Sequence, residues 1–135
     1  MEQYLGGLEP LTSPYGIETG SAEVNGHNYA RSVSLRVDKS SIPENYAEYN
    51  LGRHWRTFEA AIGLQDDAPS GCQIEFEVFV DGKAINDTKL SLGEMRDLKL
   101  NISNALRLKI QATYASSTDI SNYCYGVWGG ARLGT

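Results

Sequence analysis

The chain has 135 residues, of which 41% are hydrophobic and 21% are charged, and its formal net charge at pH 7 is −5. A chain of this length forms one ordinary globular domain, which buries roughly 65–70% of its unfolded surface. The acidic balance argues against a nucleic-acid partner, which needs a basic surface, and every apolar run is too short for membrane insertion.

Alternation of apolar and polar residues with a period of two, which is typical of strands with one buried face, recurs along the whole chain. In chain order the predicted strands are Gly16–Val24, Ser32–Asp38, Tyr46–Leu51, Phe58–Ile62, Ile74–Val80, Ala84–Thr88, Leu98–Ile102, Leu106–Ile110 and Tyr125–Leu133. The alternation is clearest in Ser32–Asp38 and weaker in the first, third, sixth and last of these segments.

Turn signals separate these segments. Asn25-Gly26 and Asp81-Gly82 are typical of two-residue hairpin loops, in which both central residues need positive φ, and Ser103–Ala105 predicts a short turn. No segment predicts a convincing helix, because Gly93 interrupts the one candidate, Leu90–Leu98. About eight to ten strands at this spacing predict an all-β domain, either a β-sandwich or a barrel.

Strand direction predicts which loops share an end of such a domain. If each strand runs opposite to the one before it, one end receives the longer loops, at Lys39–Asn45, Gln65–Cys72, Lys89–Arg96 and Tyr114–Tyr123. The other end receives mostly tight turns, at Asn25–Arg31, Gly52–Trp55, Asp81–Lys83 and Ser103–Ala105. Because binding sites form on longer loops carried by a rigid scaffold, we expect the site at the long-loop end.

The two cysteines, Cys72 and Cys124, are either one disulfide or two free thiols, and their spacing does not decide between these. If Tyr125–Leu133 pairs antiparallel with Phe58–Leu64, both cysteines lie at the long-loop end. Their Cα atoms then come within the distance of about 7 Å that a disulfide requires.

Three segments carry a family resemblance: Tyr49–Asp67, Ile74–Lys83 and Gly126–Leu133. From Tyr4 to Leu133 the chain resembles the NPCBM family of carbohydrate-binding modules. This resemblance implies a galactose-binding-domain-like jelly-roll β-sandwich with a sugar ligand. The region Gly26–Ser32 lacks the glycine-rich run of sugar-binding members. In that respect the chain resembles modules appended to bacterial signalling proteins, including Ser/Thr kinases.

A sugar presents an apolar C–H face and a rim of hydroxyl groups, so its site needs aromatic rings and planar polar side chains. At the long-loop end the predicted ligand-binding residues are Asp66, Asp67, Asp119, Asn122, Tyr123 and Tyr125. The adjacent acids Asp66 and Asp67 have two further interpretations. They can cap their own turn through hydrogen bonds to the backbone, or they can contribute to a structural calcium site, which takes six to eight oxygen ligands.

The tight-turn end supplies an alternative site. Arg31, His54 and Arg56, together with Tyr29, form a candidate patch for an anionic ligand. Trp128 lies within the last predicted strand, where a large ring is expected to fill the core.

No enzyme motif is present: the sequence has no nucleophile elbow, no HExxH pair, no phosphate-binding glycine loop and no cysteine pair at metal spacing. The leading hypothesis is a non-catalytic carbohydrate-binding module for galactose-like sugars or glycans, without a cofactor apart from the calcium alternative. The competing hypothesis is a protein-interaction or sensory domain of a signalling protein.

The segment Met1–Pro10 has no basic start, apolar stretch or cleavage site of a secretory signal, and Met1 almost directly precedes a strand-like segment. We therefore expect residues 1–135 to be a single domain of a longer protein. Its compartment is then that of the parent, and an extracytoplasmic location is favoured where the parent is secreted or membrane-anchored. The sequence does not predict the oligomeric state.

Overall fold

The computed structural model describes residues 1–116 and 123–135 and contains ten strands and one short 3-10 helix, η1 (Leu5–Gly7). The strands are β1 (Glu2–Tyr4), β2 (Glu18–Val24), β3 (His27–Val37), β4 (Glu44–Asn50), β5 (Thr57–Leu64), β6 (Gln73–Val80), β7 (Lys83–Ser91), β8 (Met95–Asn101), β9 (Arg107–Tyr114) and β10 (Cys124–Gly134). None of the described helices is long and apolar enough to cross a membrane.

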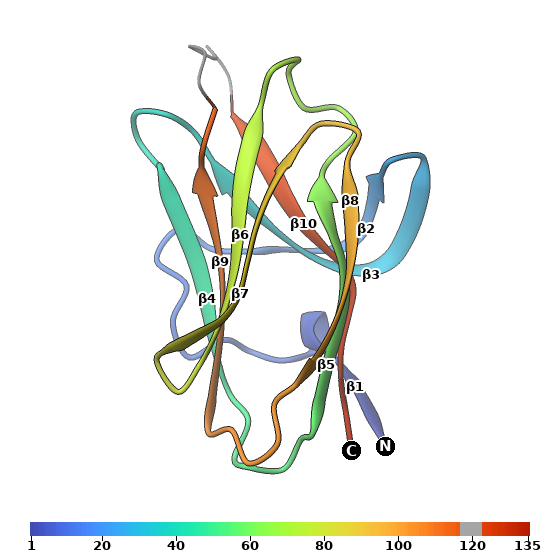
Figure 1. Ribbon diagram of the computed structural model, residues 1–135, viewed down its shortest axis with the longest axis vertical. Coiled ribbons are helices and arrows are strands. Elements are labelled where there is room, and N and C mark those ends of the chain that lie inside the picture. The colour runs from blue at the N-terminus through green and yellow to red at the C-terminus, as the bar shows by residue number, and fades with distance from the viewer. Residues whose placement is uncertain (117–122) are drawn as a thin grey trace.

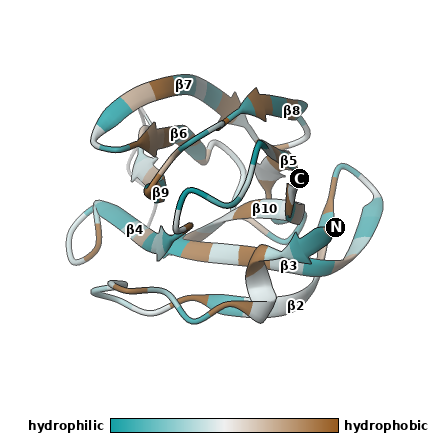
Figure 2. Ribbon diagram, turned by 90° about the horizontal axis from the view of Figure 1, so that it is seen from below, coloured by the Kyte–Doolittle hydropathy of each residue, from teal (hydrophilic) through white to brown (hydrophobic). Residues whose placement is uncertain are grey.

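Two antiparallel sheets pack face to face. Sheet A has the order β2-β3-β10-β5-β8, and β1 pairs with the last residues of β10, beyond the part of that strand that pairs with β3. Sheet B has the order β4-β9-β6-β7. Figure 2 shows the two sheets on opposite sides of the core, with apolar and polar residues alternating along several strands. The two chain ends lie side by side (Figure 1), and the Met1 amino group donates a hydrogen bond to Thr135 Oγ1.

The core lies between the inner faces of the two sheets. Trp128 of β10 is fully buried, and its ring packs against Phe58 of sheet A and Phe76 of sheet B at centroid distances of 6.5 and 5.5 Å. A Cβ at Gly126 would lie 3.1 Å from the Phe76 ring, so this position of β10 favours glycine. The expectation that Trp128 fills the core is confirmed.

Each of the nine predicted strands is present, and the all-β sandwich is confirmed. Most of the strands are longer than predicted, and β1 and η1 precede the first predicted strand. Both predicted two-residue hairpins are present. Their central residues, Asn25-Gly26 and Asp81-Gly82, all have positive φ.

The described loops gather at two ends as predicted, with one exception, whereas most of the predicted loop Tyr114–Tyr123 lies outside the described residues. Loops 38–43, 65–72 and 92–94 lie at the upper end of Figure 1, and turns 51–56, 81–82 and 102–106 lie at the lower end. The prediction that turn 25–26 lies at the lower end is wrong. The backbone N–H groups of Asn25 and Gly26 donate to the Asp66 carboxylate, at 2.7 and 2.9 Å, in a loop of the upper end.

The predicted pairing of the last strand with the fourth is also present, as β10 with β5. In this structure Cys72 and Cys124 form a disulfide, with Cα atoms 6.8 Å apart. Cys72 immediately precedes β6 of sheet B and Cys124 begins β10 of sheet A, and both residues are buried. The disulfide therefore joins the two sheets at the upper end.

Candidate functional site

The β2–β3 hairpin covers part of the outer face of sheet A. Val24 and Ala22 of the hairpin form a small apolar cluster with Val127 of β10, separate from the main core. This close contact depends on Gly63 of β5, because a Cβ there would lie 2.4 Å from a methyl group of Val24. The bend that brings the hairpin onto this face explains why its turn reaches Asp66 at the upper end.

A pocket of about 410 Å³ opens where β2 meets the loop between β5 and β6. We call it the Tyr125 pocket. It lies between the beginning of β2, the middle of β3, the 65–72 loop and the beginning of β10. The side chains that matter for its chemistry are those of Glu18, Ser21, Ser34, Gln65, Asp67 and Tyr125.

Tyr125 is half-buried in the wall of this pocket. Burial raises the pKa of its phenol, and the nearby Glu18 carboxylate raises this pKa further through its charge and as the acceptor of a hydrogen bond from the phenol. Arg36 acts in the opposite direction. The phenol is therefore a neutral hydrogen-bond donor at physiological pH, and it holds the Glu18 carboxylate at the pocket.

A second tyrosine extends the aromatic surface beside the pocket. The ring of Tyr123 is 41% exposed and lies edge-on to Tyr125, with ring centroids 5.6 Å apart. The Arg36 guanidinium carbon lies 4.2 Å from the centroid of the Tyr123 ring. Arg36 is also the β3 residue directly opposite Tyr125 in the ladder.

The predicted site residues thus have different positions. Asp67 and Tyr125 line the pocket and Tyr123 lies beside Tyr125. The Asp66 carboxylate caps turn 25–26 of the β2–β3 hairpin, and not its own turn as the turn-capping interpretation proposed. Asp119 and Asn122 lie outside the described residues. The alternative anionic patch is not assembled in one pocket: Arg31 and Tyr29 line two different pockets, and neither pocket contains His54 or Arg56.

Sequence reasoning missed the part of the pocket that β2 and β3 contribute. Glu18, Ser21 and Ser34 lie far from the 65–72 loop along the chain. Ser34 pairs with Val127 of β10, Glu18 pairs with Ser34, and Ser21 lies at the register shift of the hairpin. The one signal for the close approach of the hairpin to sheet A is Gly63, because a glycine inside a strand often marks a close backbone contact.

The pocket offers polar groups of the kinds that bind hydroxyl groups. The carboxylate of Asp67 and the amide of Gln65 make no side-chain hydrogen bond or ion pair to another described residue. A carboxylate accepts two hydrogen bonds, and an amide both donates and accepts, so each can bind neighbouring hydroxyl groups at once. With the Tyr125 ring as an apolar surface, this arrangement fits a small polyol such as a pyranose.

A family comparison agrees with this chemistry. The family model of the NPCBM/NEW2 domain matches residues 21–134. The chain belongs to the NPCBM/NEW2 domain family. The resemblance stated from the sequence is therefore confirmed, and the chain is a member of a family of non-catalytic carbohydrate-binding modules. A comparison with the curated proteins finds no match.

Solved structures place the NPCBM domain among CBM51 folds. CBM51 from Clostridium perfringens GH95, solved with methyl-galactose, matches with a TM-score of 0.78 at 20% identity, over 98% of this chain and 99% of that chain. The M60 catalytic domain with CBM51-1 and CBM51-2 from C. perfringens ZmpB matches with a TM-score of 0.80 at 20% identity, over 99% of this chain and 15% of that chain. CBM51-2 with the INT domains of ZmpB, solved with GlcNAc, matches at 0.73 and 17% identity, over 98% of this chain and 31% of that chain.

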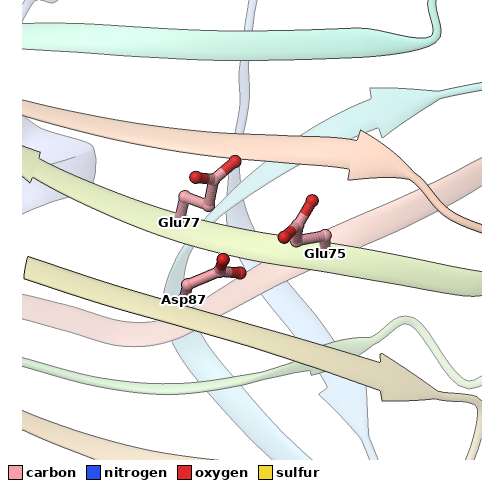
Figure 3. A group of neighbouring side chains, drawn as sticks. All are labelled: Glu75, Glu77 and Asp87. Atoms are coloured by element: carbon pink, nitrogen blue, oxygen red, sulfur yellow. The ribbon is translucent and has the colours of Figure 1, made fainter. Parts of the chain in front are cut away.

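The outer face of sheet B of the NPCBM domain carries a separate acidic cluster. One ligand oxygen from each of Glu75, Glu77 and Asp87 lies within 4.8 Å of the others (Figure 3). Among the described residues this is the one group of three or more His, Cys, Asp or Glu side chains close enough to share an ion, and it contains neither Asp66 nor Asp67. A proton shared between the carboxyl groups of Glu75 and Asp87 explains how these acidic side chains lie so close together. A hydrogen bond with Asp87, then burial and the charges of Asp87 and Glu77, raise the pKa of Glu75 to about 7.

The Glu75→Gln variant is expected to remove part of the pH dependence of stability. The pKa of Glu75 rises from 4.5 to about 7 in the folded protein, so the stabilisation by its proton is complete below pH 4.5 and is lost as the pH rises through about 7. We therefore expect the variant to be more stable than the wild type at pH 8, with a smaller difference at pH 5. Urea unfolding at both pH values measures this. Glu9→Gln, at an exposed residue outside the cluster, is the control, and equal pH dependence of the Glu75 variant and the wild type would contradict the shared proton.

Proposed function

We propose that this NPCBM domain binds a galactose-like sugar, as a unit of a glycan, in the Tyr125 pocket. The observation that carries the proposal is the composition of the pocket, which combines an aromatic ring with a carboxylate and an amide that have no side-chain partner among the described residues. The CBM51 structures that share this fold were solved with methyl-galactose and with GlcNAc, so these two pyranoses are the first ligands to test.

The affinity for one sugar is expected to be weak, with a Kd on the order of 0.1–1 mM, because the shallow pocket buries few ligand atoms. A parent protein that carries several such modules on one chain binds a glycan more tightly, because the first bound module raises the effective concentration of the others at the glycan. We infer that the domain acts in this way as an accessory part of a longer protein, as CBM51-1 and CBM51-2 accompany the M60 catalytic domain in ZmpB.

The Tyr125→Ala variant is expected to weaken binding of methyl-galactose at least about tenfold, which corresponds to about 1.4 kcal/mol. The substitution removes both the apolar ring and the phenol that holds Glu18. Tyr125→Phe keeps the ring and loses one hydrogen bond, so a loss of roughly two- to tenfold is expected. A titration followed by NMR chemical shifts measures affinities in this range and shows which residues lie at the ligand.

Tyr15→Ala is the matched control, because Tyr15 is an exposed tyrosine that lies outside the pocket. Wild-type affinity in Tyr125→Ala, from a folded protein, would refute the site. The titration is repeated with calcium and with a chelator, and equal affinities would exclude a calcium ion from this site.

The described residues give no observation that favours the competing protein-interaction hypothesis. Their exposed large apolar side chains come from four parts of the chain: Met1, the segment between η1 and β2 with Leu11 and Tyr15, Ile85 of β7, and Tyr123. One of them, Tyr123, lies beside the Tyr125 pocket.

A further inference from the structure

A second pocket, of about 460 Å³, lies next to the Tyr125 pocket where β1, η1, β2 and β3 meet. We call it the Arg31 pocket. Thr19 and Gly20 of β2 line both pockets, so the two cavities adjoin across the beginning of β2. The Arg31 pocket is therefore the neighbouring pocket that a ligand longer than one sugar unit would meet next to the Tyr125 pocket.

Arg31 supplies a positive charge to this second pocket. Its guanidinium carbon lies 4.7 Å from the centroid of the Tyr4 ring, which also lines the pocket. No carboxylate of the described residues lies within ion-pairing distance of Arg31, whereas Arg132 pairs with Glu2 and Glu59 at 3.5 Å. Glu2, the acidic residue of the pocket lining, is thus already paired with another arginine.

The guanidinium has a fork of N–H donors that matches a carboxylate in a bidentate geometry. Because Arg31 rests on the Tyr4 ring, part of its conformational freedom is already lost, and less entropy is lost on binding. Most of the other lining residues have small side chains or none, and these residues are Gln3, Gly6, Gly7, Thr19, Gly20, Ala30 and Ser32, of which Gln3 alone is long. A Cβ at Gly20 would meet no atom within 4 Å, so the space at the junction of the two pockets is open.

We propose that the Arg31 pocket is a second subsite, which binds the carboxylate of an acidic sugar such as a sialic acid or a uronic acid. The acidic unit belongs to the same glycan whose neutral unit occupies the Tyr125 pocket, and this part of the inference rests on the proposed function. Since the protein has a net charge of −5, it repels anions in general. The acidic unit is accepted only where Arg31 offsets that repulsion.

The test compares lactose with both linkage isomers of sialyllactose by titration calorimetry of the whole chain. At least one sialyllactose is expected to bind about three- to tenfold more tightly than lactose, because it adds a charge-assisted hydrogen-bonded pair at an exposed site. In Arg31→Gln this gain disappears while the affinity for lactose is unchanged. Arg96→Gln, which removes the same charge from an exposed arginine that lines neither pocket, keeps the gain.

Two results would overturn the subsite: no gain for either sialyllactose, or a gain of equal size in Arg31→Gln. A titration with N-acetylneuraminate alone, followed by NMR, separates this inference from the proposed function. Shifts at Tyr4, Thr19 and Arg31 that are absent in Arg31→Gln support the subsite even if lactose does not bind. Lactose binding that is lost in Tyr125→Ala, with no effect of N-acetylneuraminate at Arg31, supports the first site and rejects the second.

Discussion

Reduction of the Cys72–Cys124 disulfide is expected to lower the free energy of unfolding by about 4 kcal/mol. The bond closes a loop with a sequence separation of 52 residues, and the chain-entropy model assigns a stabilisation of about 4 kcal/mol to a loop of that length. The two sulfur atoms are buried and join sheet A to sheet B, so the native state holds them together without the bond. The loss is therefore expected to come mainly from the gain in freedom of the unfolded chain.

Urea unfolding of the wild-type protein with and without a thiol reductant measures this loss. The comparison changes no packing atom, unlike a Cys→Ala substitution, which adds a cavity in the core. Intact mass after alkylation under denaturing conditions establishes the redox state of each sample. An oxidised and a reduced protein with the same unfolding midpoint would refute the prediction.

Reduction is also expected to weaken sugar binding, because Cys124 directly precedes Tyr125 and fixes the beginning of β10 against β6.

The proximity of the two cysteines was predicted from the sequence through one assumption, the antiparallel pairing of Tyr125–Leu133 with Phe58–Leu64. The assumption holds, because β10 and β5 are neighbours in sheet A and Gly126 pairs with Leu64. This pairing places the beginning of β10 beside the end of β5, from which the loop to Cys72 starts.

Local pattern predicted most of the fold. The alternation in Ser32–Asp38 identifies β3, since Val33, Leu35 and Val37 all face the core with no exposed surface. The same pattern does not extend to the first part of β3, His27–Arg31, where most residues are exposed and the strand leaves the core to form the hairpin with β2. Alternation of apolar and polar residues with a period of two indicates a strand with one buried face. A strand that is exposed on both faces does not show this alternation, so the pattern cannot predict it.

The candidate site was predictable only in part for the same reason. Tyr125 and Asp67 follow from strand direction, which places their segments at the upper end. Glu18 and Ser21 do not, because their place at the pocket depends on the pairing of β2 with β3 and on the register shift of the hairpin at Ser21. Strand direction alone assumes straight strands, and it therefore assigned turn 25–26 to the wrong end of the domain.

The Gly63→Ala variant is expected to destabilise the protein by about 2–3 kcal/mol, which is typical of overpacking in a close contact. The added methyl group would lie 2.4 Å from Val24 Cγ1 and 2.9 Å from the carbonyl oxygen of Glu94. The backbone oxygen is held in the turn between β7 and β8, where Glu94 N donates to Ser91 O, so the hairpin has to move instead. We therefore expect the β2–β3 hairpin to lift from sheet A in this variant.

Hydrogen exchange at Asn25 and Gly26 reports that movement, since their N–H groups donate to Asp66 only when the hairpin is docked. Both amides are expected to exchange faster in Gly63→Ala and also in Asp66→Ala, which removes the acceptor without adding a clash. A double-mutant cycle with Val24→Ala isolates the contact, because truncation of Val24 is expected to cost less in the Gly63→Ala protein than in the wild type. Additive effects of the two substitutions, with unchanged exchange at Asn25 and Gly26, would show that the hairpin does not depend on this contact. Weaker methyl-galactose binding in Gly63→Ala, a substitution at a residue that does not line the pocket, would in turn show that docking of the hairpin builds the Tyr125 pocket.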